Sequence, residues 1–232
     1  MNSLQLYKIN RLLSEYSLSL ALLKKYQMKL LFATANKGKL REAKEILGDT
    51  VQILSPSELG INADIEESGD TLQANSILKA EALFRISGMD CFADDTGLEV
   101  DALNGAPGVM TARYAACFPG GAEPHDSDAN MSRLLEELAK CSPEAGRRAR
   151  FRTVITLILH EQKYCFEGVV HGSIATERSG NGGFGYDPIF IPDGFGGRTM
   201  ADITEDEKNA ISHRGRALRA MAEFLDTIPD LY

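Results

Sequence analysis

Residues 29–54 have the sequence KLLFATANKGKLREAKEILGDTVQIL, in which apolar runs alternate with polar breaks. The run at 29–34 has the pattern of a buried strand, and residues 51–54 have that of a second strand. Between them, residues 39–47 have helical spacing. One side of that helix would carry Leu40, Ala43, Ile46 and Leu47. A strand, a helix and a strand in succession predict an α/β fold.

The rest of the chain continues this alternation. We expect strands at 91–93 running into 94–97, with 98–103 extended, and at 151–160, 164–171 and 189–191, and helices at 71–86, 127–140 and from 204 towards 225. Ser68 or Asp70 is the expected cap of the helix at 71–86, and Thr204 with Glu207 has the pattern of a capping box. Because no repeat or linker interrupts the order, we predict a single α/β domain with a mixed twisted sheet and flanking helices.

Composition limits the partners of this chain. Its 232 residues carry a formal net charge of -8, so it should repel nucleic acid and anionic membranes unless its cations are clustered. A polyanionic ligand would therefore need a local basic patch. The four cysteines are too far apart for a zinc knuckle or a redox pair, which favours reduced thiols in a cytoplasmic protein. No run approaches the roughly 20 apolar residues of a membrane span.

The first 27 residues are set apart from the rest. They hold a short apolar patch at 18–23 and a single early lysine, Lys8, with no small-residue cleavage site, so they make a poor signal peptide. Met28 stands directly before the first strand. Residues 1–27 could form an added helical arm, but we favour an upstream start that adds little to the fold and leaves a mobile extension. The domain would then cover 28–232.

A first candidate site lies between the first strand and the first helix. It comprises Thr34, Ala35, Asn36, Lys37, Gly38 and Lys39. Backbone N–H groups at a helix start attract anions, and a glycine lets a ligand approach the backbone closely. The segment lacks the spacing of a Walker A loop, and a plain turn with solvated lysines is the alternative. Cations at this helix start oppose the helix dipole, a conflict that a bound phosphate chain would reverse.

The same conflict recurs near the C-terminus. Ser212 could cap a second helical stretch there, and His213, Arg214 and Arg216 would occupy its first turn. A basic helix face in water is the simple alternative. Two helix starts of this kind in an acidic protein favour a shared anion site.

Two acidic pairs, Glu66-Glu67 and Asp94-Asp95, could hold the magnesium ion that accompanies a nucleoside triphosphate. Asp94 and Asp95 follow an apolar strand, at the edge where α/β proteins place ligands. Adjacent carboxylates repel each other unless a cation joins them. Residues 95–97 also resemble an aspartic-protease signature, but no second copy is present, and aspartyl-phosphate phosphatases use aspartates two positions apart.

Two further segments are less specific. Asn75 and Lys79 share a helix face, where Lys79 could reach the carboxylates or a phosphate, although an ordinary polar stripe explains the pair equally well. The glycine-rich stretch before Phe184, Gly185, Tyr186 and Asp187 could clamp a base through ring stacking. An aromatic plug under a loop is the alternative.

Taken together, these segments resemble the inosine-triphosphate pyrophosphatase family. The likeness spans about 29–225 and follows the family's order of motifs. The matching stretches are 34–39, 67–70 with Asn75 and Lys79, 94–97, 105–108 with 112–114, 182–188 and 207–214. Several coincident motifs in one order are far more specific than any one of them. Ala35 departs from the glycine common at that position, and 1–27 lies outside the likeness.

The resemblance implies an elongated α/β fold with two lobes around a central cleft, a homodimer, and hydrolysis of ITP, dITP and XTP to monophosphate and pyrophosphate. It makes Asp95 the general base and a metal ligand, with Glu67 or Glu66 holding Mg²⁺ and Asp94 in support. Substrate contacts would come from Thr34, Ala35, Asn36, Lys37, Gly38, Lys39, Lys79, Thr96, Phe184, Gly185, Tyr186, Asp187, Lys208, His213 and Arg214. Phe184 would stack on the base. A pyrophosphatase for other modified nucleotides and a non-catalytic nucleotide-binding protein are the alternatives.

Overall fold

The computed structural model describes residues 28–48, 51–62, 65 and 67–228. The expectation for the extension 1–27 and the metal-ligand candidate Glu66 lie outside the described residues. Within the described part, no helix is both long and apolar enough to cross a membrane. The cysteines Cys91, Cys117, Cys141 and Cys165 are all free, as their spacing predicts.

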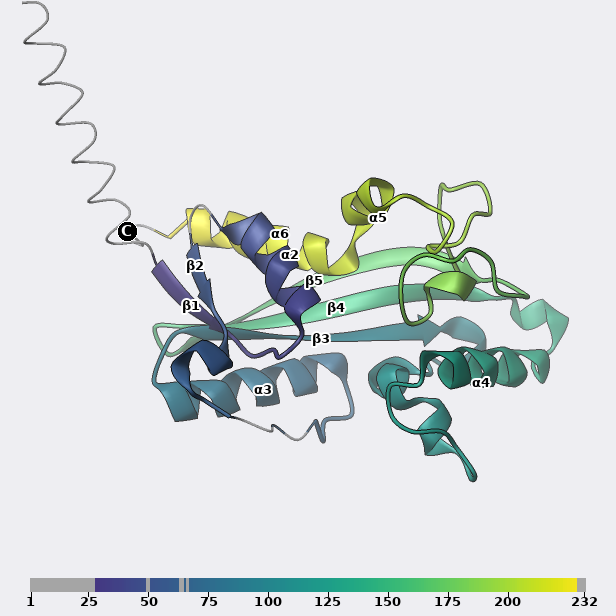
Figure 1. Cartoon of the computed structure of the whole chain (residues 1–232), viewed down its shortest axis with the longest axis horizontal. Helices are drawn as coiled ribbons and strands as arrows, with labels where there is room; N and C mark the ends of the chain where they lie inside the picture. Colours follow the sequence, from purple (N-terminus) through teal and green to yellow (C-terminus); the bar gives the residue numbers. More distant parts are fainter. Residues whose placement is uncertain (1–27, 49–50, 63–64, 66, 229–232) are drawn as a thin grey trace, which may run out of the picture.

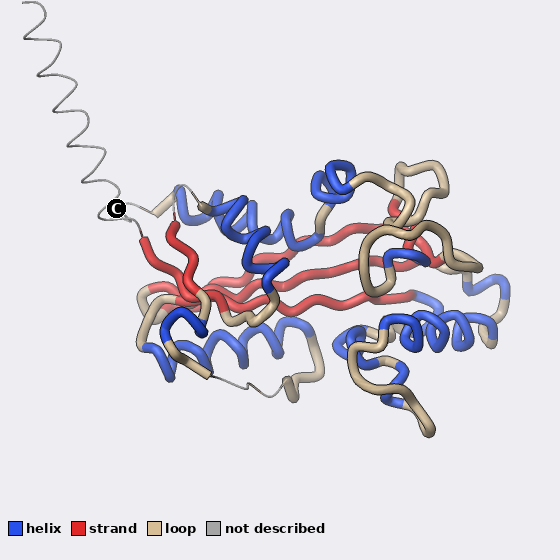
Figure 2. The backbone as a smooth tube through the Cα atoms, viewed as in Figure 1, coloured by secondary structure: helices blue, strands red, loops and turns tan. Residues whose placement is uncertain are grey.

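The centre of the molecule is a six-stranded mixed sheet in the order β2-β1-β3-β4-β5-β6 (Figure 2). The strands are β1 Met28–Phe32, β2 Val51–Leu54, β3 Cys91–Val100, β4 Arg148–Leu159, β5 Gln162–Ile174 and β6 Phe190–Pro192. β1 pairs in parallel with β2 and β3, whereas β3, β4, β5 and β6 pair antiparallel. The predicted mixed sheet is confirmed.

Helices cover both faces of the sheet at the end that holds β1 and β2 (Figure 1). Helices α2, Lys37–Leu47, and α6, His213–Asp226, lie together on one face, and α3, Leu72–Ser87, lies on the other. Their apolar sides bury separate clusters, one under α2 and α6 and one under α3. The long strands β3, β4 and β5 run on past these helices and make the molecule elongated.

A further core lies at the far end of these strands. Helix α4, Ser127–Ala139, and the loops around β6 pack there against the distal parts of β3, β4 and β5. Along β4, Phe151 belongs to this distal core and Ile155 to the core under α2 and α6. Thr153 lies between them in the same strand, so polar residues at its level separate two lobes of one sheet.

Most local predictions hold, but the cap of α3 differs from the prediction, and two runs that were predicted separately form one strand. Thr71 rather than Ser68 or Asp70 caps α3, because its hydroxyl accepts from the Ala74 N–H at 3.0 Å. Strand β3 combines the run at 91–97 with the first part of the extended run at 98–103.

The expected caps near the C-terminus form. Thr204 and Glu207 close a capping box on α5, Glu205–Ile211, and Ser212 caps α6. Short 3₁₀ turns, which the sequence pattern did not single out, are η1 Pro56–Leu59, η2 Asp101–Leu103, η3 Gly108–Arg113, η4 Ala115–Cys117, η5 Pro143–Ala145 and η6 Asp187–Ile189.

Candidate active site

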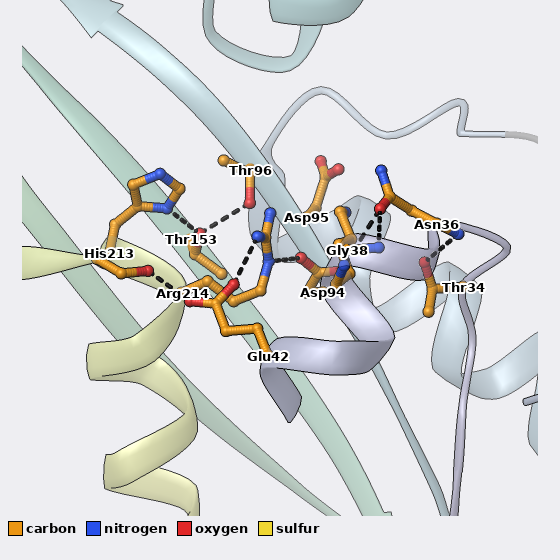
Figure 3. Close-up of polar contacts among 12 residues, drawn as sticks. Thr34, Asn36, Gly38, Glu42, Asp94, Asp95, Thr96, Thr153, His213 and Arg214 are labelled. Carbon is orange, nitrogen blue, oxygen red and sulfur yellow. Dashed lines mark hydrogen bonds and ion pairs between the residues drawn. The ribbon is translucent and has the colours of Figure 1, made fainter. Parts of the chain in front are cut away.

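The candidate site is built around two neighbouring aspartates in the middle of β3. Side chains alternate across a strand, so Asp94 points towards α2 and α6 whereas Asp95 points towards α3. Figure 3 shows the two carboxylates directed away from each other. The expected repulsion, relieved by one shared cation, is therefore replaced by a separate set of partners on each face.

Asp94 forms ion pairs with the first turns of both α2 and α6. Its two oxygens accept from Lys39 Nζ and Arg214 Nε, each at 2.9 Å, and only 2% of its surface is exposed. Burial by itself would raise the pKa of Asp94, but the adjacent cations Lys39 and Arg214 outweigh it and hold that pKa well below its usual range. The carboxylate therefore stays ionised and joins the two helix starts.

The phosphate-loop candidate has the geometry of a capped helix start. The Asn36 side chain accepts from the N–H groups of Gly38 at 2.8 Å and Lys39 at 3.1 Å, and Thr34 Oγ1 accepts from the Asn36 N–H at 3.1 Å. Lys37 and Ala35 are exposed beside it. The conflict of Lys39 with the helix dipole is relieved here by Asp94, so this conflict does not by itself require a phosphate.

Glu42 adds a second tie between these helices. It accepts from Ser212 Oγ at 2.6 Å and from Arg214 Nη1 at 3.0 Å, so one α2 side chain holds both the cap and the first cation of α6. The guanidinium of Arg214 thus lies between two carboxylates (Figure 3). Burial opposes the charge of Arg214, but Asp94 and Glu42 more than compensate and raise its pKa.

A chain of three side chains runs beside this cluster. The Thr96 and Thr153 hydroxyl oxygens are 2.7 Å apart, and Thr153 Oγ1 is 2.6 Å from Nδ1 of His213 (Figure 3). The His213 ring also stacks on Phe151, with 5.2 Å between ring centroids. Burial, Arg214 and other nearby cations lower the pKa of His213 to about 3, so its ring is neutral near pH 7.

On the opposite face, Asp95 belongs to a network with α3. Lys79 Nζ donates to Glu67 at 2.7 Å and to Asp95 at 3.1 Å, and the Asn75 amide donates to Asp95 at 3.3 Å. Asn75 also accepts from the Gly69 N–H at 2.8 Å, which fixes the loop that carries Glu67. Burial and the neighbouring Glu67 raise the pKa of Asp95 although Lys79 opposes the rise.

The segment at 183–187 forms the distal side of the site. Phe184 is 75% exposed, and Lys208 Nζ lies 4.9 Å from the centre of its ring. Asp187 accepts from Lys208 Nζ at 2.6 Å and from the Phe184 N–H at 2.8 Å. Tyr186 differs from its neighbours because its ring is buried and its hydroxyl donates to the Thr111 carbonyl at 2.9 Å. Its side chain is therefore the aromatic plug of the alternative interpretation.

The structure brings most of the predicted residues into one region that spans both faces of β3. Lys39 and Arg214 meet on Asp94, Lys79 joins Glu67 to Asp95, and Lys208 joins Asp187 to Phe184. The two basic helix starts therefore lie on one side of the molecule, as the anion-site hypothesis requires. Among the described residues no three His, Cys, Asp or Glu side chains cluster as a complete metal site.

Three residues of the site escaped the sequence analysis: Thr153, Glu42 and Gly168. Gly168 pairs across the sheet with Thr153, and a Cβ atom there would collide with the His213 carbonyl oxygen. The absence of a side chain thus lets α6 lie close to β5. Glycine in the middle of a strand is the signal that could have identified it, since it often marks a close backbone approach.

Comparison with known proteins places this geometry in a family. The dITP/XTP pyrophosphatase of Porphyromonas gingivalis is 50% identical over 197 residues, which cover 85% of this chain and 97% of that protein. The Bacillus subtilis dITP/XTP pyrophosphatase is 43% identical over 198 residues, covering 84% and 96%.

Solved structures give the same result. A HAM1 protein from Coxiella burnetii matches with a TM-score of 0.77 and 38% identity, covering 87% of this chain and all (100%) of that one. The Ham1 protein of Staphylococcus aureus matches with a TM-score of 0.75 and 38% identity, covering 85% and 98%. A model of the Ham1 family matches residues 30–224. With nearly the whole described chain inside that match, this protein belongs to the Ham1 family.

Proposed function

We propose that this protein hydrolyses noncanonical purine nucleoside triphosphates, namely ITP, dITP and XTP, to the monophosphate and pyrophosphate. The observation that carries the proposal is the position of Asp95 on β3. Its carboxylate has a raised pKa and lies close to Glu67, and Lys39 and Arg214 lie on the opposite face of the same strand. The activity for which these relatives are named, dITP/XTP pyrophosphatase, has the same requirements: a base, counter-charges for phosphate and a purine subsite.

The phosphate chain would lie against the starts of α2 and α6. Lys39 and Arg214 supply positive charge there, and the exposed Lys37 adds to it. The Thr34 hydroxyl lies at the same place, where the N–H groups of Asn36, Gly38 and Lys39 already have side-chain acceptors. Because Asp94 and Glu42 hold Arg214 in one geometry, the guanidinium is preorganised and loses little freedom when it meets an anion.

We further propose that Glu67 and Asp95 hold Mg²⁺. Lys79 Nζ lies within hydrogen-bond distance of both carboxylates, so this point already accommodates a cation. Two carboxylates suit Mg²⁺, which takes its remaining ligands from phosphate oxygens and water. Asp94 has both oxygens engaged by cations, which favours a supporting role, and Glu66 remains a candidate by its place in the sequence. When bound, the ion would neutralise phosphate charge.

The reaction is the attack of a water oxygen on the α-phosphorus. A bond forms between that oxygen and phosphorus, the bond from the α-phosphorus to the α–β bridging oxygen breaks, and pyrophosphate leaves with the electron pair. Asp95 would accept the proton that the water loses, a role to which its raised pKa suits it. Lys39 and Arg214 would stabilise the charge that moves onto pyrophosphate.

The base would stack on Phe184. An aromatic ring that is 75% exposed and has a lysine near its face offers a stacking surface that the fold itself leaves unused. Asp187 and Lys208 would line the edge of the base together with the backbone at Gly185 and Tyr186. The ring of Tyr186 is excluded from this role by its burial.

The proposal extends to a homodimer in the cytoplasm. Four free cysteines favour a reducing compartment. The dimer rests on the family resemblance, and light scattering after size-exclusion chromatography tests it directly. If the protein is a fully active monomer, the homodimer proposal is wrong and the proposed hydrolysis stands.

The deciding experiment uses the full chain with Mg²⁺ and a panel of ITP, dITP, XTP, dATP, dGTP and a modified pyrimidine triphosphate. We expect pyrophosphate without free phosphate, fastest with the 6-oxo purines that lack a 2-amino group. In ¹⁸O-labelled water the label should enter the monophosphate, because water attacks the α-phosphorus. Label in pyrophosphate, or release of orthophosphate, would refute the proposed cleavage. Preference for the pyrimidine would favour the alternative pyrophosphatase.

Asp95→Asn is the matched test of mechanism. It should abolish turnover while a nucleotide still binds, as measured by calorimetry, because Lys39, Arg214 and Phe184 are unchanged and Glu67 remains to hold Mg²⁺. Binding without turnover by the wild-type protein would indicate a nucleotide-binding protein instead. Retained turnover by Asp95→Asn would remove Asp95 from the mechanism.

A further inference from the structure

The chain Thr96–Thr153–His213 has a role that the proposed reaction has not used. Thr153 is fully buried, yet its hydroxyl touches two polar atoms, Thr96 Oγ1 at 2.7 Å and His213 Nδ1 at 2.6 Å. Within the described part of the chain, Thr153 is the hydrogen-bond partner of the His213 ring. A buried hydroxyl with two such neighbours fixes the direction of the hydrogen bonds on each side of it.

The position of His213 favours one order of donors. His213 opens α6, so Nδ1, the ring nitrogen nearer its own backbone, lies at the positive end of the helix dipole. A lone pair is favoured over an N–H at that position. The Thr153 hydroxyl then donates to Nδ1 and accepts from the Thr96 hydroxyl, so each hydroxyl proton has a protein acceptor.

This order leaves one proton without a partner among the described side chains, the one on Nε2. The ring cannot rotate to hide it, because Phe151 stacks on it and Thr153 holds Nδ1. Gly168, the cross-strand neighbour of Thr153, provides the space that brings the α6 start over this point. His213 therefore offers a ligand a fixed donor.

We propose that Thr153 is a positioning residue that holds neutral His213 as its Nε2–H tautomer, so that His213 donates one hydrogen bond to an acceptor oxygen of the bound nucleotide. This inference rests on the proposed function. The oxygen belongs to the base carbonyl or to a phosphate. The two sources predict different kinetics, because a 6-oxo purine has a carbonyl where adenine has an amino group, whereas their phosphates are the same.

The first test needs no substrate. The chain has four histidines, few enough to assign in a ¹⁵N spectrum of the nucleotide-free protein by single substitutions. Wild-type His213 should show an unprotonated, hydrogen-bonded Nδ1 and a protonated Nε2. Thr153→Val, which keeps shape and removes the hydroxyl, should give averaged shifts of two exchanging tautomers, and Thr153→Ser should restore the wild-type pattern. A proton on wild-type Nδ1, or an unchanged spectrum in Thr153→Val, would overturn the inference.

A matched control is available in the same strand. Thr156 is equally buried and its hydroxyl lies 2.7 Å from that of Ser76, on the face that α3 covers. Thr156→Val should leave the His213 tautomer as in wild type. A shift in this variant equal to that in Thr153→Val would show that general loosening, and not the hydrogen bond to Nδ1, controls the ring.

The kinetic test identifies the oxygen. If the acceptor oxygen is the base carbonyl, Thr153→Val should lower kcat/KM for dITP about tenfold and leave kcat/KM for dATP unchanged. If the acceptor is a phosphate oxygen, kcat/KM should fall equally for both nucleotides. Thr153→Ser should recover most of either loss. An unaltered kcat/KM for both nucleotides would refute the positioning role. Because the tautomer is read without nucleotide, failure of the proposed hydrolysis would not be mistaken for failure of this inference.

Discussion

The carboxylates of Asp94 and Asp95 are consecutive in the chain but serve opposite faces of β3, Asp94 with Lys39 and Arg214 and Asp95 with Lys79. One strand thus separates a carboxylate that stays ionised from one whose pKa is raised. Because both residues are aspartates, their neighbours and not their residue type account for the difference in pKa. In the proposed reaction, Asp94 would fix the cations of the phosphate subsite, and Asp95 would act as the base.

Asparagine substitutions should separate these roles. Asp94→Asn leaves the Lys39 and Arg214 charges without their shared counter-charge in a buried place, so we expect a loss of about 3 kcal/mol in the free energy of unfolding. Asp95→Asn should not lower stability in this way, because Lys79 keeps Glu67 as a partner. Urea unfolding of the metal-free proteins measures both. Equal urea midpoints for Asp94→Asn and wild type would contradict this account.

The same contrast predicts opposite pH dependences. The pKa of Asp94 is lower in the folded protein than its unfolded value of about 3.9, so its stabilisation is complete above that pH and is lost as pH falls through the folded pKa. The stability gap between wild type and Asp94→Asn should therefore narrow as pH is lowered from about 6 to about 2. A gap that stays constant over this range would show that charge is not its cause.

The pKa shift of Asp95 is opposite in sign to that of Asp94, so its effect on stability is opposite too. Its folded pKa is raised, so its ionised form costs stability above that pKa, and this cost disappears as pH falls below the unfolded value. Metal-free Asp95→Asn should accordingly be at least as stable as wild type at neutral pH and lose any advantage in acid. Urea midpoints of the same two proteins across pH provide the check. A neutral-pH midpoint below that of wild type would count against it.

The sequence predicted those parts of the site that local rules control. The Ser212 cap and the Thr204–Glu207 capping box follow from residue type and spacing, and both form. The convergence of the two basic helix starts was also expected. The split of Asp94 from Asp95 could have been read from the period of two in a strand, but treating the pair as a single acidic motif obscured it.

Other features depend on contacts that no local pattern contains. Thr153 meets His213 because β4 and α6 adjoin in the fold, and Glu42 reaches Ser212 from a helix 170 positions earlier. Tyr186 is adjacent in sequence to an exposed ring, yet its own ring is buried against the distal core. Burial of this kind is decided by packing between segments distant in sequence, which spacing alone does not report.

Gly168 offers a test of how closely α6 must approach the sheet. A Cβ at Gly168 would collide with the His213 carbonyl oxygen, so Gly168→Ala should push the α6 start outward, lower stability by about 2 kcal/mol and raise KM. Gly172, in the same strand, is a matched control because a Cβ there meets the Ile191 carbonyl oxygen at β6 instead. Gly172→Ala should destabilise similarly and leave KM near wild type.

The comparison between the two alanine variants is decisive only when both are folded. Circular dichroism and urea midpoints establish that, and KM for dITP is then measured well below each midpoint. If Gly172→Ala raises KM as much as Gly168→Ala does, general destabilisation explains the effect. The close approach of α6 would then have no special part in binding.

Phe184→Ala should have a large effect on binding and little effect on stability, which is the reverse of the result expected for Gly172→Ala. Its ring is 75% exposed, so Phe184→Ala should change the free energy of unfolding by less than about 0.5 kcal/mol. Loss of stacking on a base typically costs about 1–3 kcal/mol, so KM for dITP should rise by roughly tenfold. Phe184→Tyr keeps a ring and should retain most of the affinity.

Ile86 provides the control for this last substitution, since it is also a large exposed apolar residue, at 58%, but lies near the end of α3. Ile86→Ala should change neither KM nor kcat. Stacking requires an aromatic face, so Phe184→Leu, which preserves apolar bulk without a ring, should resemble Phe184→Ala and not Phe184→Tyr. If Phe184→Leu binds dITP as well as wild type, the residue acts as an apolar cover, and the base is recognised elsewhere.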